Sequence, residues 1–180
     1  MASNHLALLR GINVGGKHKL PMKELAAIFE AAGAKDVRTL IQSGNVVFAA
    51  DAKLAKRVPA LVEAEIQARF GFPAPVVLCS AAEVCTAIDR SPFLAKGLSE
   101  DVVHLMFLKE APGAARAAAL GTSPFLPDEF VLLDREIHLH LPKGVADTKL
   151  TNAWFDGRLK TVCTGRNWRT MTKLRALLEG

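Results

Sequence analysis

Residues 37–49 read VRTLIQSGNVVFA, and this segment limits the topologies that the rest of the chain can adopt. Two runs that favour β-structure, Val37–Gln42 and Asn45–Ala49, flank Ser43-Gly44, a compact turn pair that is typical of a β-hairpin. A strand and a helix are predicted before this hairpin, and a helix and a strand after it. The predicted order is therefore β-α-β-β-α-β.

Hydrophobic spacing places the other elements of this first half. Apolar side chains recur every three or four residues in two segments, as on one face of a helix. The second helix is expected to start near Val58, because Pro59 is tolerated only in the first turn of a helix. The predicted elements are a strand at His5–Gly11, a helix with Pro21 at its first position that Gly33 closes, a helix from Val58 that ends before Gly71, and a strand at Pro75–Cys79.

The same order is predicted a second time. The second half is preceded by a linking helix at Ala81–Asp89 and a loop with Ser91-Pro92. Its predicted elements are a strand at Val102–Leu108, an alanine-rich helix at Gly113–Leu120, a hairpin of Phe130–Leu133 and Glu136–Leu141 about Asp134-Arg135, a helix near Asn152–Leu159 and a strand at Thr161–Thr164. A last helix is predicted from Trp168. The predicted class is α+β, with two ferredoxin-like (βαββαβ) halves, antiparallel sheets and a C-terminal helix. The predicted domains are residues 1–80, the first plait, and residues 81–180, the linking helix, second plait and C-terminal helix.

Positive charge is concentrated near the two ends of the sequence. The chain has 23 Lys and Arg against 18 Asp and Glu, a formal net charge of +5. Residues 1–19 and residues 157–178 contain basic side chains and no acid. An anionic ligand or a nucleic acid favours such a distribution. The alternative is that basic ends only aid solubility.

Neither a secretory signal nor a membrane span is indicated. Leu6–Leu9 is the only apolar run before Arg10, and a signal needs an apolar region of about 7–15 residues. No run approaches the roughly 20 apolar residues of a membrane span. Cys79, Cys85 and Cys163 form no CxxC pair and leave one over, which fits buried thiols in a reducing compartment. We therefore expect a cytoplasmic protein with no membrane partner, and the oligomeric state is not indicated.

Topology predicts that two segments of the first half meet. In a split βαβ unit, the first and second strands run parallel and the third lies between them, so the end of the first strand and the hairpin share one edge of the sheet. The Arg10–Lys17 loop and the Gln42–Asn45 turn should therefore lie together. The candidate ligand-binding residues at this edge are Arg10, Asn13, Gly15, Gly16, Lys17, Gln42, Ser43 and Asn45.

The loop formally matches the phosphate-binding pattern GxxxxGK between Gly11 and Lys17. A nucleotide-hydrolysing loop of this type needs Ser or Thr next and a helix that begins at the lysine. Here His18 follows, and Pro21 delays the helix, so this function is not expected. A simpler anion nest of glycine amides is the functional interpretation, and glycines that only shape a turn are the alternative. A tight turn is likewise the alternative for Gln42–Asn45.

A second basic segment, Arg166-Asn167-Trp168-Arg169, is predicted at a junction between a strand and a helix. Asn167 is a good N-cap for the last helix. The guanidinium groups of Arg166 and Arg169 beside a helix N-terminus suit phosphate or carboxylate, so Arg166, Asn167 and Arg169 are further candidate ligand-binding residues. The alternative is a capped, docked helix with Trp168 in the core.

His138 and His140 alternate with apolar residues and share one face of a strand with Glu136. Two histidines at this spacing can begin a metal site, but no third ligand is evident. We expect a solvated sheet face here, and no metal or cofactor. His104 is expected to be structural, and no cysteine is recognisably paired with a histidine as a nucleophile.

An ordered set of motifs runs through the chain: Ala7-Leu-Leu-Arg-Gly-Ile-Asn-Val-Gly-Gly-Lys17, Leu20-Pro-Met22, Asp36-Val-Arg38, Gln42-Ser-Gly-Asn-Val-Val-Phe48, and Thr164-Gly-Arg-Asn-Trp168 through Lys173-Leu174. This set resembles the bacterial family known as domain of unknown function 1697. The resemblance implies two alpha-beta plait halves and supplies no activity. The chain departs from the family pattern at Gly165, where alanine or threonine is expected.

Three functions remain open. The first is binding of an anionic ligand, either a nucleotide-like small molecule or a nucleic-acid backbone, where the two basic segments approach each other. The second is an enzyme that acts on a phosphorylated or carboxylated small substrate, although no nucleophile or acid–base pair is evident. The third is a structural or protein-interaction module. Because the aromatic RNP pattern is absent, phosphates rather than stacked bases would hold a nucleic acid.

Overall fold

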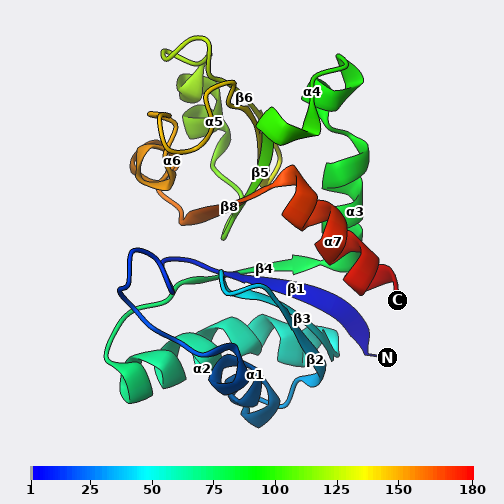
Figure 1. Ribbon diagram of the computed structural model, residues 1–180. Coiled ribbons are helices and arrows are strands. Elements are labelled where there is room, and N and C mark those ends of the chain that lie inside the picture. The colour runs from blue at the N-terminus through cyan, green and yellow to red at the C-terminus, as the bar shows by residue number, and fades with distance from the viewer. Residues whose placement is uncertain (1) are drawn as a thin grey trace. The chain divides into compact units, whose positions relative to one another are not determined.

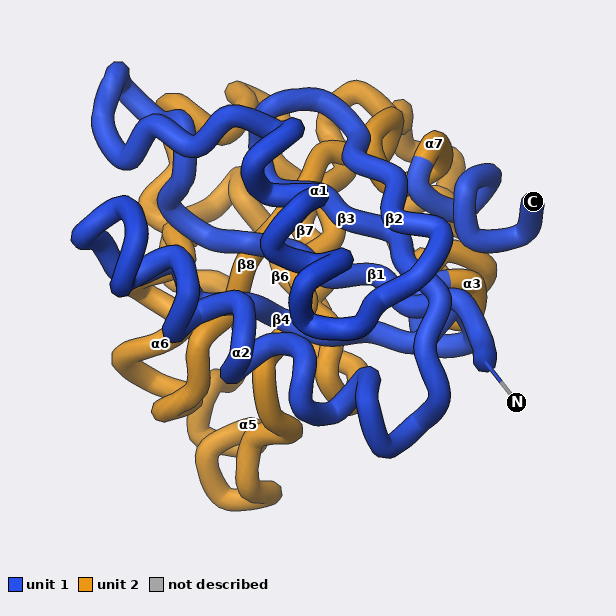
Figure 2. Tube along the Cα trace, turned by 90° about the horizontal axis from the view of Figure 1, so that it is seen from below, with its two compact units in different colours: residues 1–84, 174–180 blue, residues 85–173 orange. Residues whose placement is uncertain are grey.

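The computed structural model describes residues 2–180, which form two compact units (Figure 2). Unit 1 contains the chain up to Val84 together with Leu174–Gly180, and unit 2 contains Cys85–Lys173. The division falls within two helices, α3 (Ala81–Asp89) and α7 (Trp168–Glu179).

Unit 1 is a four-stranded antiparallel sheet in the order β2-β3-β1-β4, with α1 and α2 on one face (Figure 1). Because β3 pairs antiparallel with both β1 and β2, the first two strands run parallel, as the ferredoxin-like fold requires. The elements are β1 (Ser3–Leu9), α1 (Met22–Ala31), β2 (Lys35–Leu40), β3 (Asn45–Ala50), α2 (Ala52–Phe70) and β4 (Val76–Ser80).

The core of unit 1 lies between this sheet and its two helices. Leu25, Phe29 and Phe48 are completely buried there, and each stabilises the fold by about 2 kcal/mol through removal of apolar surface from water. The second half of α7, from Leu174, also belongs to this unit. Asn4 Nδ2 donates to the Leu178 carbonyl over 2.8 Å. This hydrogen bond satisfies one of the carbonyl groups that have no partner within the helix at its C-terminus.

The predicted start of α2 near Val58 is wrong, because the helix begins at Ala52. Asp51 Oδ1 accepts a hydrogen bond from Leu54 N over 2.8 Å and caps the helix. Pro59 therefore lies inside the helix, where proline costs about 3 kcal/mol. Burial of one apolar face offsets this cost, and its members are Ala55, Val58, Val62 and Ile66.

Unit 2 repeats the architecture in the strand order β6-β7-β5-β8, again antiparallel throughout. The predicted duplication of an α+β plait with a C-terminal helix is thereby confirmed. The elements before α7 are α4 (Pro92–Ala95), a 3₁₀ turn (Glu100–Val102), β5 (Val103–Leu108), α5 (Ala114–Leu120), β6 (Glu129–Leu133), β7 (Glu136–His140), α6 (Asn152–Leu159) and β8 (Cys163–Asn167). The predicted loop at Ser91-Pro92 starts α4, because Ser91 caps that helix.

The last strand corrects the predicted span of Thr161–Thr164, because it extends to Asn167. Its pairing also explains the glycine at position 165. Gly165 lies opposite Met106 of β5, and a Cβ atom there would lie 2.7 Å from Met106 Cγ. An alanine or threonine would force that buried side chain to move.

Candidate functional site

The loop after β1 meets the β2–β3 turn, as the topology predicts. Leu9 N donates to the Gly44 carbonyl over 2.8 Å, and Asn13 Nδ2 donates to the Gln42 carbonyl over 2.9 Å. The approach at Gly44 is close: a Cβ there would lie 2.7 Å from Leu9 Cβ and 2.9 Å from Ile12 Cδ1. Gly44 also has a φ of +75°, so this position needs glycine for two independent reasons.

Residues 10–20, which we call the glycine loop, form a small hairpin of their own. Lys17 N donates to the Val14 carbonyl, and Asn13 N to the His18 carbonyl, each over 3.0 Å. Gly15 and Gly16 between them have φ values of +57° and +74°, the left-handed pair of a type I′ turn. The backbone of Lys17 thus belongs to a turn, and α1 begins only at Met22.

The side chain of Asn13 anchors the base of this loop. Its Nδ2 donates to the Leu20 and Gln42 carbonyls over 2.9 Å each, and its Oδ1 accepts from Leu20 N over 2.8 Å. Both amide hydrogens are therefore used inside the protein. Asn13 positions the loop against the turn by these bonds.

His18 is a member of the loop that the motifs did not single out. It has a φ of +51°, its Nδ1 lies 2.8 Å from the Gly11 carbonyl oxygen, and its ring stacks on Phe72 at a centroid distance of 4.6 Å. This contact fixes the imidazole beside the turn. Nothing local in the sequence points to it, because Phe72 lies after a different helix.

The tip of the loop is exposed and basic. Gly15, Gly16, Lys17 and Lys19 are all exposed, and Val14 is 66% exposed. Within residues 2–180, neither lysine forms an ion pair with a carboxylate. The tip thus presents two lysine charges and a glycine turn to solvent.

The other predicted residues of this edge differ in exposure. Arg10 is half-buried, and its N–H donates to the Pro75 carbonyl over 3.0 Å. Gln42 is exposed and Ser43 is half-buried. Asn45 is completely buried, where its Nδ2 donates to the Leu40 carbonyl and to Ser43 Oγ over 2.9 Å each. Asn45 therefore braces the turn from within.

The second basic segment belongs to unit 2, and its groups are engaged there. Arg166 Nη1 donates to Thr164 Oγ1 and to the Gly165 carbonyl over 2.9 and 2.8 Å, and burial lowers the pKa of Arg166 to about 10. Arg169 Nη2 lies 2.7 Å from Asp101 Oδ1, in an exposed ion pair. A ligand shared by this segment and the glycine loop stays a prediction.

Asn167 caps α7, as expected, because its Oδ1 accepts from Thr170 N over 2.8 Å. Trp168 is 3% exposed and so lies in the core, which agrees with the alternative of a capped, docked helix.

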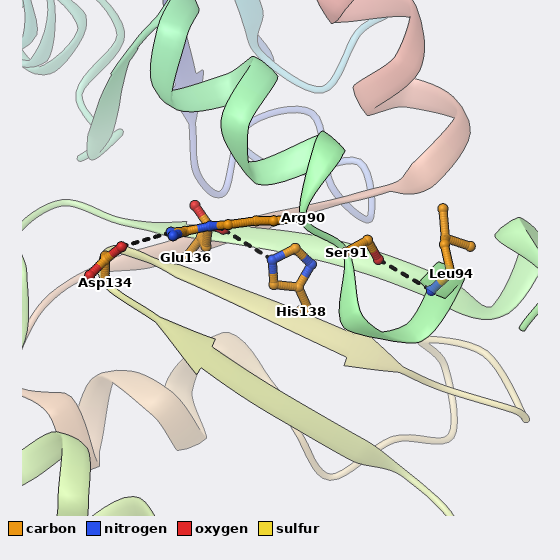
Figure 3. Close-up of polar contacts among 6 residues, drawn as sticks. All are labelled: Arg90, Ser91, Leu94, Asp134, Glu136 and His138. Atoms are coloured by element: carbon orange, nitrogen blue, oxygen red, sulfur yellow. Dashed lines mark hydrogen bonds and ion pairs between the residues drawn. The ribbon is translucent and has the colours of Figure 1, made fainter. Parts of the chain in front are cut away.

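The expected solvated face around His138 is wrong, because His138 is completely buried (Figure 3). Its Nε2 lies 3.1 Å from Glu136 Oε1, which also accepts from Arg90 Nε over 2.7 Å. Arg90 Nη2 donates to Asp134 Oδ2 over 2.8 Å. Burial alone raises the pKa of Glu136, but the bonds from His138 and Arg90 outweigh burial and leave this pKa below its usual value. The sequence did not reveal this cluster, because Arg90 lies 46 residues from Glu136.

Residues 2–180 contain no cluster of three or more His, Cys, Asp and Glu side chains arranged to hold a metal ion. None of the helices in this part of the chain has the length and apolar character needed to cross a membrane.

Duplicated plaits and their loops define an α+β protein built from two ferredoxin-like units. The chain belongs to the family described as "Protein of unknown function (DUF1697)", whose model matches residues 2–138. Among solved structures it is similar to the conserved bacterial protein SP0830 from Streptococcus pneumoniae, with 22% sequence identity, a TM-score of 0.76 and coverage of 99% of both chains. That likeness concerns the fold. No curated protein matches the chain.

Proposed function

We propose that this protein binds the phosphate backbone of a nucleic acid through the glycine loop of unit 1. The observation that carries the proposal is the tip of this loop, where the exposed turn Gly15-Gly16 stands beside the exposed cations Lys17 and Lys19. The loop and everything before it contain no acidic residue.

The chemistry of the tip suits phosphate oxygens. Successive backbone N–H groups in a turn can form an anion-binding nest, and Gly15 and Gly16 are successive residues of an exposed turn. Lysine supplies a flexible point charge that follows a phosphate without a fixed geometry. The hydrogen bonds of Asn13 and the stacking of His18 on Phe72 hold the loop in place before any ligand arrives.

Exposure favours a polymer over a small molecule. Small ligands occupy concave sites that bury most of their surface, whereas the residues from Val14 to Lys19 are all exposed. Binding to a nucleic-acid backbone requires only positively charged side chains that can extend to the phosphates. We therefore favour binding of a nucleic acid over binding of a nucleotide-like small molecule and over an enzyme that acts on a phosphorylated substrate.

Salt-dependent binding tests the proposal. Binding of a labelled short duplex DNA to the wild type should weaken steeply with salt. The double variant Lys17→Ala/Lys19→Ala should bind more weakly, and its log–log salt slope should be smaller by about 0.9 for each phosphate that the protein no longer neutralises. The matched control Lys53→Ala/Lys56→Ala removes the same charge from exposed positions on α2 of the same unit, and should bind like the wild type.

Two results would contradict the proposal. Equally weakened binding in both double variants would mean that DNA responds only to net charge. Stabilisation of the wild type by inorganic triphosphate without any binding of DNA would instead assign the loop to a small phosphorylated ligand.

A further inference from the structure

We propose that the outer edge of β6 binds an extended segment of a partner protein, which adds to the sheet of unit 2 as a further antiparallel or parallel strand. Strand β6 lies at one edge of this sheet, in the order β6-β7-β5-β8. Its sequence from Phe130 to Leu133 is entirely apolar. Strand addition of this kind uses main-chain hydrogen bonds for affinity and side-chain pockets for specificity.

The hydrogen-bond pattern shows which groups of β6 face outward. Leu108 N donates to the Arg135 carbonyl and Leu141 N to the Val102 carbonyl, each over 2.8 Å, so the odd-numbered residues of β7 bond to β5. Its even-numbered residues therefore bond to β6, at positions 129, 131 and 133. The N–H and C=O groups of Phe130 and Leu132 consequently point away from the sheet.

A cavity of about 550 Å³ runs beside these two residues. Ala117 and Leu120 of α5 form one wall, and Phe130 and Leu132 form the other. A strand paired with β6 would place alternate side chains over this cavity, because side chains of neighbouring strands at the same level share a face. Apolar side chains fit these walls.

The equivalent edge of unit 1 is protected against such pairing. Strand β2 carries charges at Lys35, Asp36 and Arg38, and its register with β3 shifts between Lys35 and Arg38. Charges and bulges are the usual means by which edge strands avoid a new neighbour. Strand β6 has an unbroken register with β7 from Glu129 to Leu133 and has no charge inside its apolar run.

Charge indicates the chemistry of the partner segment. Glu129 and Asp134 stand at the two ends of the apolar run, and their side chains are 47% and 79% exposed. Glu129 Oε1 lies 3.2 Å from His140 Nδ1, and Asp134 Oδ2 accepts from Arg90 Nη2, so these contacts use one oxygen of each carboxylate and the second oxygen remains for a partner segment. The guanidinium of Arg135 is engaged with the Leu108 carbonyl, over 3.0 Å from Nη2. A segment of alternating apolar residues with a basic residue at each end therefore complements this edge.

A second copy of the chain fits the edge less well. If two β6 strands paired antiparallel through Phe130 and Leu132, Asp128 of each copy would lie directly opposite Asp134 of the other. Like charges opposed across a strand pair are destabilising. In the register that pairs Phe130 with Leu132, the acidic ends thus favour a basic partner segment over self-association.

The test uses the full chain and three labelled peptides, measured by fluorescence anisotropy. The first has the sequence Lys-Thr-Val-Thr-Val-Thr-Lys, the second has Glu in place of both lysines, and the third has proline in place of the central threonine. The first peptide should bind, and the other two should bind about fivefold to tenfold more weakly, because each loses about 1 kcal/mol of charge attraction or main-chain hydrogen bonding.

Two variants of α5 locate the site. Ala117→Gln extends a side chain into the cavity and should weaken binding of the first peptide about fivefold, whereas Ala118→Gln on the exposed face should leave it unchanged. Amide exchange in the wild type should slow at Phe130 and Leu132 when this peptide is bound, which tests the site even if Ala117→Gln does not fold.

Several outcomes would overturn this inference. They are no binding of the first peptide, equal binding of all three peptides, and amide protection away from β6. Concentration-dependent dimerisation through β6 would mean that a second copy, and not a basic segment, occupies the edge.

Discussion

The two units have the same strand order, yet they connect the first strand to the first helix differently. In unit 1 this connection is residues 10–21 and includes the glycine loop, whereas in unit 2 residues 109–113 are enough. The hairpin loop is also longer in unit 1, where it consists of residues 41–44, than in unit 2, where it consists of Asp134-Arg135. Because the short connections close the same topology in unit 2, the topology does not require a connection as long as that of unit 1. Ile12 and Leu20 of the glycine loop are buried in the core, whereas residues 14–19 are exposed. The exposed residues 14–19 are therefore the part of this connection that is available for binding.

The largest effect on stability is expected at Gly44, where the loop and the turn touch. Gly44→Ala should lower the free energy of unfolding by about 3 kcal/mol, from a left-handed backbone and a close contact with Leu9 and Ile12. Gly16→Ala shares the left-handed backbone but meets open space, and should cost about 1 kcal/mol. Urea unfolding of both variants measures the difference.

Equal costs for Gly44→Ala and Gly16→Ala would show that the close contact of loop and turn is not tight in solution. The loop would then not be held ready for a ligand.

The next effect concerns unit 2, whose charges are paired inside the protein. Arg90→Met should lower the free energy of unfolding by about 2 kcal/mol, because it removes a hydrogen-bonded partner of the buried Glu136 carboxylate. The binding of duplex DNA should not change. Weaker DNA binding with unchanged stability would instead give this cluster a functional role.

A smaller effect depends on pH and concerns His104 in β5 of unit 2. Burial lowers the pKa of His104, although a hydrogen bond to the backbone of Val102 partly opposes this. Below about pH 6.5 the unfolded chain binds a proton there that the folded chain does not, so stability is lost on acidification by at most about 1.4 kcal/mol per pH unit.

Unfolding of the wild type and of His104→Gln at about pH 7 and about pH 5 measures this contribution. The variant should lose less stability on acidification than the wild type. Identical decreases in the two proteins would contradict a lowered pKa at this position.

The smallest effect on stability is expected at the tip of the glycine loop. Lys17→Ala/Lys19→Ala should change the free energy of unfolding by less than about 0.5 kcal/mol, as exposed substitutions do. A large destabilisation would mean that these lysines stabilise the fold. The longer connection of unit 1 would then be explained by stability and not by ligand binding.

The topology of the chain could be predicted because it depends on local signals. Strand-like runs on both sides of Ser43-Gly44 and of Asp134-Arg135 predict two hairpins, and the order of elements then predicts one sheet in each half. The meeting of the glycine loop with the Gln42 turn followed from that order alone.

Two wrong predictions, the start of α2 and the solvated face at His138, have a different cause. They depend on contacts between residues that are distant in sequence, or on two local signals that favour different boundaries. Pro59 dominated the prediction for α2, whereas the cap at Asp51 and a buried apolar face decide where the helix begins. His138 looked like part of a polar face because Arg90 lies far away in the sequence. For the same reason, the stacking of His18 on Phe72 could not be foreseen.

Binding of nucleic acid at the glycine loop is measured by titrating the isotope-labelled protein with short duplex DNA and following its backbone amide resonances. The amides of Gly15, Gly16 and Lys17 should shift most, while those of Glu110, Ala111 and Gly113, in the matching connection of unit 2, should stay in place. Shifts confined to unit 2, or spread evenly over exposed lysines with the glycine loop unmoved, would contradict binding at this loop.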